Sequence, residues 1–595
     1  MADETVAEFL LRRLRDWDVE HVFGYPGDGI NGLLGAWERA DDNPRFIQAR
    51  HEELAAFEAV GYAKFSDDVG VCAATGGPGA IHLLNGLYDA KLDHVPVVAI
   101  VGQQASTSLG GAYQQEVDLS SLYKDVAEFS QFISAPQQLP NALDRAMRTA
   151  QVRRTVAALI IPNDVQEMAY SAPTHEFKMV PSSVGISDSV TAPAEADLDR
   201  AAEVLNSGER VAIMIGQGAR GAANEVTAVA DTLGAGVAKA LLGKDVLPDD
   251  LPWVTGAAGL LGSKPSWEMM RDCDTLLMIG AGFPYSQFLP EYDQARAVQI
   301  DIDPTMIGMR YPFEVNLLGD AATTLQFLLP KLHRKENEPW RKKIEDSVSD
   351  WWKVLERRAA VSADPINPER VFHELSPRLP DDAIITGDSG SVANWYARHL
   401  RVRGAMRCSL SGTLATMGPG APYATGAKFA QPDRPVIALV GDGAMQMNGI
   451  NELITIGQFW REWRDPRVVI GVLNNRDLNQ VTWELRALGG SPQFVPSQRV
   501  PDLDYAAFAR AAGFRGIRVQ DPGEVADAWE QALNAEQPCL VEFVTDPAVP
   551  PIPPQANREQ IESVTEAMLK GDPDGWSVAK EGIKSKMQEF LPRRR

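Results

Sequence analysis

Two short motifs in the last third of the chain place polar side chains directly after apolar runs. Gly441-Asp442-Gly443 follows the run VIALV, and Asn474-Asn475 follows the run VVIGVL. Carboxylate and amide oxygens suit Mg²⁺, which also binds phosphate oxygens. The glycines beside Asp442 let a diphosphate approach the backbone, and the N-terminus of a following helix attracts the anion. Plain turns are the alternative, but the shared position after two buried strands favours a magnesium and diphosphate site.

A third motif, near the N-terminus, offers a group for proton transfer. Arg50-His51-Glu52-Glu53 precedes the alanine-rich helical pattern LAAFEAVGYAK. A carboxylate at the start of a helix usually only complements the helix dipole. The residues alone therefore leave Glu52 with a structural interpretation beside a catalytic one.

The elements that must position these motifs alternate along the chain. Amphipathic stretches, such as the one whose apolar face would be Val6, Phe9, Leu10, Leu14 and Trp17, are separated by short apolar runs. These runs do not alternate with polar residues, which is typical of strands buried on both faces of a parallel sheet. Alternating strands and helices indicate an α/β architecture. The runs are Pro96–Val101, Ala157–Ile161, Val211–Ile215, Thr275–Ile279, Val436–Val440, Val468–Leu473 and Val541–Val544.

Breaks in composition divide the chain into domains. Ser171–Pro193 is rich in Ser, Pro and Thr, as in a linker, and the charged segment His333–Arg358 indicates a helix or a tether. From Pro547 onward the stretch PAVPPIPPQ has too much proline for a central strand or a helix. We expect three doubly wound parallel-sheet domains of the α/β class at about 1–175, 190–335 and 365–545, followed by a C-terminal tail at 546–595. One sequence cannot show whether the first and third domains are related.

Composition narrows the function classes. The 595 residues carry 57 Lys and Arg against 80 Asp and Glu, a net charge of −23, so nucleic acid is not expected as a partner. The four cysteines lie far apart in the sequence, which indicates free or buried thiols in a reducing compartment. The first residues do not resemble a signal peptide, and no apolar run reaches the roughly 18 residues of a membrane span. We expect a cytoplasmic protein.

The motifs of the third domain resemble those of the thiamine-diphosphate-dependent enzymes, whose signature is GDG followed by NN. Here 30 residues separate the two motifs, and SGTLATMGPGAP supplies a further match. The resemblance implies Mg²⁺ bound by Asp442, the Asn475 side chain and the backbone carbonyl of Asp477. Met417 matches the bulky residue that wedges between the two cofactor rings and bends them into a V; a simple core methionine is the alternative. Further contacts with thiamine diphosphate are implied at Gly390, Ser391, Ala415, Thr416, Gly443, Ala444, Leu478, Asn479, Gln480 and Val481.

The first domain shows matching features. Glu52 matches the family glutamate that hydrogen-bonds N1′ of the aminopyrimidine and favours the imino tautomer, whose N4′ can take the C2 proton. VFGYPGDGINGL resembles the loop on the pyrimidine side, and the loop TGGPG that follows a later strand also matches. Cofactor contacts are implied at Tyr25, Pro26, Gly27 and Thr75, and Gln115 matches an active-site glutamine.

Within the family, the chain resembles most the flavin-containing pyruvate oxidases and pyruvate:quinone oxidoreductases. The segments that carry this resemblance are RHEELAAFEA, GGPGAIHLLNGLYDAKLDHVPV, TGAAGLLG, GAGFPY, QIDIDPTMIG and IPPQ. That branch binds FAD in the middle domain, although a lone Gly-x-Gly also fits a plain strand-to-helix turn. The implied FAD contacts are Gly216, Gly218, Ala258, Gly259, Leu260, Leu261, Ala281, Gly282, Phe283, Pro284, Tyr285, Asp301, Ile302 and Asp320.

Several residues depart from the oxidase pattern. Leu242 stands where arginine is usual, Gln114 where phenylalanine is usual, and Gln480 where an aromatic residue is usual; GDGAMQMNGINEL looks more like acetohydroxyacid synthases. His82 matches an oxidase active-site histidine, with a packed structural histidine as the alternative. Glu484 aligns with a carboxylate near the reacting carbon, with a solvated helical glutamate as the alternative.

The resemblance implies oxidative decarboxylation of a small 2-oxo acid, with pyruvate as the first candidate and electrons passing through FAD to quinone or another acceptor. Carboligation as in acetohydroxyacid synthases, or non-oxidative decarboxylation, with FAD only structural, is the alternative. In the family the two halves of the cofactor are held by different subunits, so a homodimer is the expected minimum and a homotetramer the expected assembly. The tail has an apolar stripe at Ile583, Met587, Phe590 and Leu591 and basic residues that include Arg593–Arg595. This pattern is typical of a segment that contacts an anionic membrane surface, and a helix packed on its own subunit is the alternative.

Overall fold

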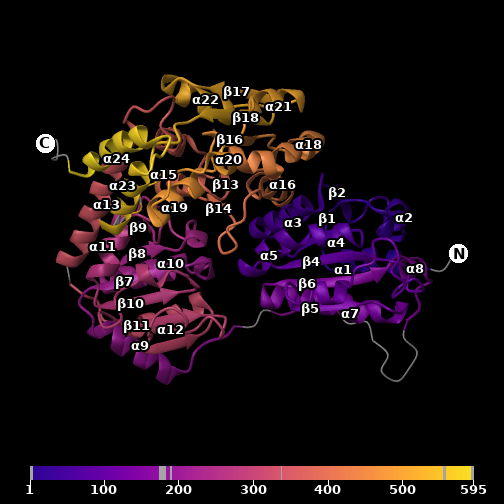
Figure 1. Ribbon diagram of the computed structural model, residues 1–595. Helices are drawn as coiled ribbons and strands as arrows, with labels where there is room; N and C mark the ends of the chain where they lie inside the picture. Colours follow the sequence, from indigo (N-terminus) through magenta and orange to yellow (C-terminus); the bar gives the residue numbers. More distant parts are fainter. Residues whose placement is uncertain are drawn as a thin grey trace.

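The protein is described from a computed structural model covering residues 4–172, 183–187, 190–336, 338–551, 553 and 558–590. Three six-stranded sheets, each entirely parallel, follow one another along this part of the chain and are covered by helices (Figure 1). The α/β class with three doubly wound sheets is therefore confirmed. The seven predicted apolar runs all correspond to strands of these sheets, except that Pro96 lies just before its strand. The charged segment after residue 333 forms a long helix, α13 (Glu338–Ala359).

The first sheet has the strand order β2-β1-β3-β4-β6-β5. Its strands are β1 (His21–Gly24), β2 (Arg45–Gln48), β3 (Gly70–Ala74), β4 (Val97–Gln103), β5 (Phe129–Phe132) and β6 (Val156–Pro162). The central strands β3, β4 and β6 are buried throughout, which explains their unbroken apolar sequences. The helices are α1 (Val6–Asp16), α2 (Asn31–Arg39), α3 (Glu52–Ser66), α4 (Pro78–His82), α5 (Leu84–Leu92), α6 (Leu119–Leu122), α7 (Leu139–Arg153) and α8 (Asn163–Glu167).

The middle sheet has the order β12-β11-β10-β7-β8-β9: β7, β8 and β9 are added toward one edge of the sheet and β10, β11 and β12 toward the other, so the strand order reverses between β7 and β10. Its strands are β7 (Val211–Ile215), β8 (Gly236–Lys239), β9 (Val254–Ala257), β10 (Thr275–Ile279), β11 (Arg296–Asp301) and β12 (Val315–Leu318). The helices are α9 (Glu195–Ser207), α10 (Ala223–Leu233), α11 (Lys264–Asp272) and α12 (Ala321–Leu328). This order is that of dinucleotide-binding folds, in which ligands bind at the point of reversal.

The third sheet has the order β14-β13-β15-β16-β18-β17, which repeats the topology of the first sheet strand for strand. Its strands are β13 (Ile384–Gly387), β14 (Arg407–Ser409), β15 (Val436–Gly441), β16 (Val468–Asn474), β17 (Arg515–Val519) and β18 (Cys539–Val544). The helices are α14 (Pro368–Leu375), α15 (Ser391–His399), α16 (Gly420–Ala430), α17 (Asp442–Ala444), α18 (Ile450–Phe459), α19 (Asn479–Gly489), α20 (Val495–Gln498), α21 (Tyr505–Ala511) and α22 (Val525–Leu533).

The first and third domains are locked together by α3 and α16, which lie against each other in Figure 1. A Cβ atom added to Gly61 of α3 would lie 2.6 Å from Tyr423 Cα, and one added to Gly426 of α16 would strike the carbonyl oxygen of Glu58. Glycine is required at both positions because the two helix backbones touch there.

The tail forms two helices, α23 (Arg558–Leu569) and α24 (Gly575–Phe590). Helix α23 packs on α19, and α24 packs on α13. Arg486 of α19 donates to both carboxylate oxygens of Asp572 at 2.8 Å, and both side chains are buried. Ile583 and Met587 of the predicted stripe are exposed, whereas Leu591 and Arg593–Arg595 lie outside the described residues. Among the described residues, no helix has the length and apolar character that a membrane crossing requires.

Candidate active site

The predicted magnesium motif lies where the strand order of the third sheet reverses, between β13 and β15. Asp442 follows β15, and Gly390 and Ser391 follow β13, the neighbouring strand of the sheet. Ligands of open α/β sheets bind outside the carboxyl ends of strands at such a reversal. A Cβ added to Gly390, which has φ +98°, would meet no atom within 4 Å, so the turn is open at the N-terminus of α15.

Asp442 is a buried carboxylate that fits a divalent cation. Its Oδ1 accepts from Gly443 N at 2.8 Å, and its Oδ2 accepts from Arg476 N at 2.5 Å. Burial raises the pKa of Asp442 to about 7, because these backbone bonds only partly compensate for lost solvation. Among the described residues no Lys, Arg or His pairs with it, so a bound Mg²⁺ is the charge that would keep it ionised at neutral pH.

The turn after β16 supplies the other oxygens of the predicted metal set. Asn475 Oδ1 accepts from Asp477 N at 3.0 Å, which curls the chain back toward Asp442. The Asp477 carboxylate accepts from Thr482 Oγ1 at 2.8 Å and from Gln493 Nε2 at 2.9 Å. That side chain therefore stabilises the turn, in keeping with a ligand role for the backbone carbonyl of Asp477 rather than its carboxylate. The donor set of carboxylate, amide and carbonyl oxygens fits Mg²⁺.

Met417 reaches this site from the loop before α16. A Cβ on Gly443 would lie 3.1 Å from Met417 Cε and 2.7 Å from the Leu478 side chain. The loop is strained, because Ala415 has φ +53°. The next residue, Thr416, donates its backbone N–H to Ser411 Oγ at 3.0 Å.

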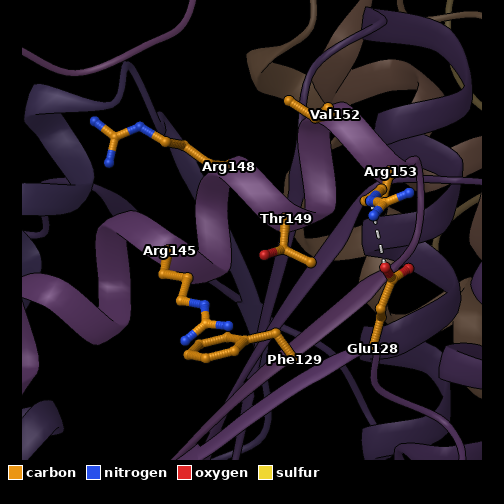
Figure 2. A pocket seen from close by; sticks show the side chains of 7 residues that line it. All are labelled: Glu128, Phe129, Arg145, Arg148, Thr149, Val152 and Arg153. Atoms are coloured by element: carbon orange, nitrogen blue, oxygen red, sulfur yellow. Dashed lines mark ion pairs between the residues drawn. The ribbon is translucent and has the colours of Figure 1, made fainter.

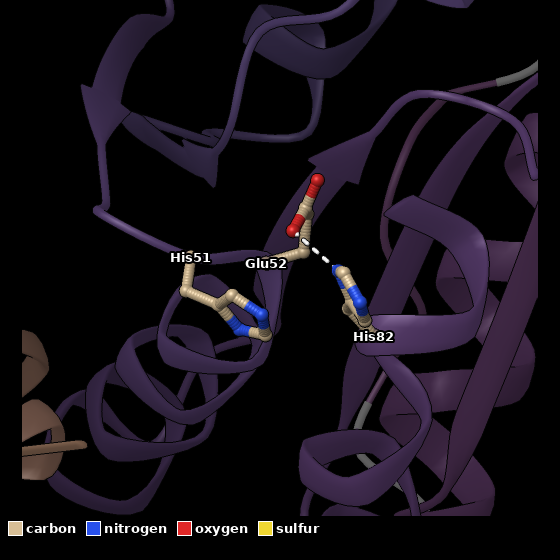
Figure 3. A group of neighbouring side chains, drawn as sticks. All are labelled: His51, Glu52 and His82. Carbon is tan, nitrogen blue, oxygen red and sulfur yellow. Dashed lines mark hydrogen bonds and ion pairs between the residues drawn. The ribbon is translucent and has the colours of Figure 1, made fainter. Parts of the chain in front are cut away.

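Glu52 is a buried carboxylate of the first domain. It begins α3, is 7% exposed, and its Oε2 lies 2.9 Å from His82 Nδ1 (Figure 3). The His51 ring lies beside the His82 ring, with centroids 4.4 Å apart. His82 is thus in direct contact with the predicted catalytic carboxylate, an arrangement that favours an active-site role over simple packing.

The loops of Glu52 and Met417 meet within one chain. Asn85 Nδ2 donates to Glu53 Oε1 at 2.5 Å and to Thr416 Oγ1 at 3.0 Å. Asn85 therefore bridges the turn beside Glu52 and the residue before Met417. The family resemblance implies that the two halves of the cofactor are held by different subunits. That arrangement, and with it the homodimer and the homotetramer, stays a prediction.

The remaining first-domain residues surround Glu52. Thr75 Oγ1 accepts from Gly29 N at 3.0 Å, and a Cβ on Gly27 would lie 2.6 Å from Thr75 Cβ, so the turn containing Tyr25 and Pro26 packs on the turn after β3. Gln115 has φ +62°, and its Oε1 is buried without a hydrogen-bond partner. A strained backbone and an unpaired polar atom at one residue indicate a position adapted to a ligand.

Helix α19 carries the other predicted contacts. Gln480 Oε1 accepts from Asn394 Nδ2 at 2.8 Å, and Gln480 Nε2 donates to Glu484 Oε1 at 3.0 Å. Val481 and Glu484 are exposed, whereas Asn479 is buried and donates to the Pro547 carbonyl at 2.9 Å. The exposure of Glu484 leaves both interpretations of this residue open.

The predicted FAD residues gather at the carboxyl edge of the middle sheet. Gly216 and Gly218 follow β7 and Ala281–Tyr285 follow β10, on either side of the point of reversal. A Cβ on Gly259, in the loop Ala258–Leu261 after β9, would lie 3.2 Å from the Phe283 ring, so these two loops meet. The exposed apolar residues there are Leu260, Tyr285 and Ile302. This edge fits a dinucleotide.

Some of these residues have structural roles of their own. Gly216 and Gly218 pack against the backbone of Gly280, which by itself explains glycine at both positions. Asp320 caps α12 by accepting from Thr323 N at 2.8 Å. Asp301 Oδ1 accepts from Asp303 N at 3.0 Å, which leaves its other oxygen for a ligand hydroxyl.

A cavity of about 460 Å³ lies elsewhere, between α7 and β5. Arg145, Arg148 and Arg153 are among the residues that line it (Figure 2). The Arg145 guanidinium lies over the Phe129 ring, 4.8 Å from its centroid, and Arg153 Nε lies 3.5 Å from Glu128 Oε1. None of the predicted site residues lines this cavity, so it is not part of the candidate active site.

The fold defines an α/β protein with three parallel-sheet domains, and the candidate site residues lie at strand ends of the two outer domains. The chain matches the thiamine pyrophosphate enzyme N-terminal TPP binding domain at residues 4–122, the central domain at 198–328 and the C-terminal TPP binding domain at 388–543. It therefore belongs to the thiamine pyrophosphate enzyme family.

Similar proteins span nearly the whole chain. The Bacillus subtilis protein named "Putative thiamine pyrophosphate-containing protein YdaP" is 35% identical over 96% of both chains. Pyruvate oxidase of Lactiplantibacillus plantarum is 29% identical over 90% of this chain and 87% of its own. Acetolactate synthase isozyme 2 large subunit of Escherichia coli is 30% identical over 94% of this chain and 100% of its own. These similarities support the family and do not separate the oxidase branch from the synthase branch.

Proposed function

We propose that the protein catalyses thiamine-diphosphate- and FAD-dependent oxidative decarboxylation of a small 2-oxo acid, with pyruvate as the first candidate substrate and quinone or another molecule as the final electron acceptor. The observation that carries the proposal is the bridge through Asn85 between the turn of buried Glu52 and the Met417 loop, whose Met417 side chain lies beside Gly443 of the Asp442 turn. Pyruvate oxidase and acetolactate synthase are similar to the chain at nearly equal identity, so the choice of the oxidative branch rests on the site residues.

The residues have distinct tasks in this reaction. When bound, thiamine diphosphate supplies the nucleophilic carbon and takes up the electrons left when CO₂ departs, and FAD supplies the electron sink. Asp442, Asn475 and the Asp477 carbonyl would hold Mg²⁺, and the Gly390 and Gly443 turns would receive the diphosphate. Glu52 would hold a proton at the pyrimidine nitrogen, and Met417 would keep the two rings bent.

The oxidative branch receives specific support from His82. The 2.9 Å contact between His82 Nδ1 and Glu52 Oε2 puts the residue that matches an oxidase active-site histidine on the catalytic carboxylate. An acetolactate synthase-type carboligase is the second candidate, favoured by GDGAMQMNGINEL and by relatives of that name at similar identity.

Anaerobic mixing with pyruvate separates the two reactions. The purified protein, loaded with thiamine diphosphate, Mg²⁺ and FAD, is mixed with pyruvate in a stopped-flow spectrometer while the flavin absorbance is followed. The proposed reaction bleaches the flavin at least as fast as the steady-state turnover. Acetolactate formation without bleaching would replace the oxidase by the synthase, and absence of both products with every small 2-oxo acid tried would refute the proposal.

A further inference from the structure

The loop that carries Met417, residues 410–419, is attached at its start to a buried carboxylate of the other catalytic domain. Asp93, directly after α5, is fully buried; its Oδ1 accepts from Thr413 N at 2.8 Å and its Oδ2 from Gly412 N at 3.0 Å. Lys64 Nζ donates to Asp93 Oδ2 at 2.8 Å and also to the Leu410 carbonyl at 2.7 Å. The first domain thus holds the backbone of Leu410, Gly412 and Thr413 at the start of this loop.

The end of the same loop is attached to a second buried carboxylate, this time in the third domain. Asp388, directly after β13, is fully buried and accepts from Gly418 N through Oδ1 and from Gly420 N through Oδ2, both at 2.9 Å. Its Oδ1 also accepts from Ser389 N at 2.8 Å. Among the described residues no cation pairs with Asp388, and burial raises its pKa to about 6. Backbone N–H groups are therefore its only compensation for desolvation.

The segment between the two attachments is short and strained. Ala415, at φ +53°, lies between Thr413 and Met417, and the Met417 tip lies beside Gly443. A non-glycine residue keeps such a conformation only where its surroundings over-determine it. The paired carboxylates supply that constraint, because they fix the chain on both sides of Ala415, Thr416 and Met417.

We propose that Asp93 and Asp388 are positioning residues that together set the Met417 side chain against the cofactor rings, Asp93 from the pyrimidine side and Asp388 from the diphosphate side. This inference rests on the proposed function, because it assumes that Met417 bends a bound thiamine diphosphate. The hydrogen-bond partners of the two carboxylates are not among the residues that we assign to the cofactor. Each carboxylate therefore acts through the loop.

An amide cannot replace either carboxylate without loss. Asp93 faces three donors and Asp388 faces three backbone N–H groups, so the NH₂ group of an asparagine would meet a donor in either orientation. One loop N–H would then lose its partner and the loop would shift. A misplacement of about 1 Å in a catalytic arrangement can cost about a hundredfold in rate.

The test measures hydrogen–deuterium exchange at C2 of bound thiamine diphosphate, with saturating cofactor and Mg²⁺, in Asp93→Asn and Asp388→Asn. We expect exchange to fall at least about tenfold in each variant, within the range for a misplaced group, while calorimetry gives an almost unchanged cofactor affinity. In a Met417→Ala background, neither substitution should slow exchange further, because the residue that they position is gone.

Asp249→Asn is the matched control. Asp249 is a buried carboxylate that pairs with Lys239 Nζ at 2.5 Å and accepts from Val402 N at 2.8 Å, but it does not touch the Met417 loop. It should leave exchange at the parent rate. If Asp388→Asn fails to fold, Gly420→Ala replaces it: its Cβ would lie 2.9 Å from Asp388 Oδ2 and push on the same contact while the carboxylate stays.

The outcomes are distinguishable. Parent-like exchange in folded Asp93→Asn and in folded Asp388→Asn or Gly420→Ala overturns the positioning role and leaves the proposed function standing. A loss that persists undiminished in the Met417→Ala background also overturns it, because the carboxylates would then act by another route. If the parent protein itself does not accelerate exchange over free cofactor, the proposed function fails, and the positioning role fails with it.

Discussion

Replacing Glu52 by Gln is the sharpest test of the proposed chemistry. The change keeps the shape of a side chain that is 7% exposed, begins α3 and contacts His82. Loss of one negative charge at a helix N-terminus costs only about 0.3–1 kcal/mol, so the protein should stay folded. The proposed Mg²⁺ and diphosphate contacts all belong to the third domain, so cofactor affinity should be almost unchanged.

The expected effect lies in proton transfer. An amide cannot hold or release a proton at the pyrimidine nitrogen, and the loss of a general acid–base group costs about 10²–10⁴ in rate. At 1.36 kcal/mol per factor of ten, the low end corresponds to about 2.7 kcal/mol of barrier. We therefore expect at least about a hundredfold loss of turnover and a parallel loss of exchange at C2.

Glu53→Gln is the matched control, since it changes the next residue of the same helix turn. Its amide oxygen can still accept from Asn85 Nδ2, so the bridge to Thr416 survives. Parent-like exchange in Glu53→Gln with lost exchange in Glu52→Gln is the expected pattern. Exchange in Glu52→Gln as fast as in the parent would remove Glu52 from the mechanism.

Four further predictions concern metal binding, domain packing, pH and the tail. Asp442→Ala should abolish measurable thiamine diphosphate binding at millimolar Mg²⁺, and calorimetry with parent affinity would contradict the metal site. Gly426→Ala should lower the unfolding midpoint by several degrees, because the added Cβ would strike the Glu58 carbonyl. Gly513→Ala is the control for the loss of chain entropy, since a Cβ there meets open space. The positive φ of Gly513 adds a small cost of its own to that control. Burial raises the pKa of Glu452 to about 7, so folding favours the protonated carboxyl. The free energy of unfolding should therefore fall as the pH rises from about 5 to 7. Glu452→Gln should flatten this pH dependence when unfolding is measured by urea titration. We also propose that the tail contacts anionic membranes, so removing residues from Gly582 onward should abolish sedimentation with anionic vesicles without unfolding the protein, and equal sedimentation before and after truncation would leave the tail a structural role.

Much of the architecture could be predicted because it depends on local patterns. Unbroken apolar runs such as Val211–Ile215 are strands because both of their faces are buried, and this is visible in the sequence. Asp442 and Asn475 could be placed together because both follow neighbouring strands of a parallel sheet.

Other features depend on contacts between distant residues. Asp93 and Asp388 are single acids in loops, and nothing near them in the sequence shows that they hold the same segment from two domains. The contact of Glu52 with His82 and the pair Arg486–Asp572 likewise join residues brought together only by tertiary packing. The glycines at 216 and 218 do not by themselves indicate phosphate binding, because close packing against Gly280 requires glycine at the same positions.

The shared strand order of the first and third sheets has a geometric consequence. Two domains of one topology, joined in a single polypeptide, present equivalent strand ends to a common ligand. The turn after the first strand is Tyr25–Gly27 in one copy and Gly390 in the other, and the turn after the third strand is Thr75 in one and Asp442 in the other. Equivalent strand ends therefore carry different side chains: the first sheet has a threonine after its third strand, where the third sheet has the carboxylate that we propose as a metal ligand.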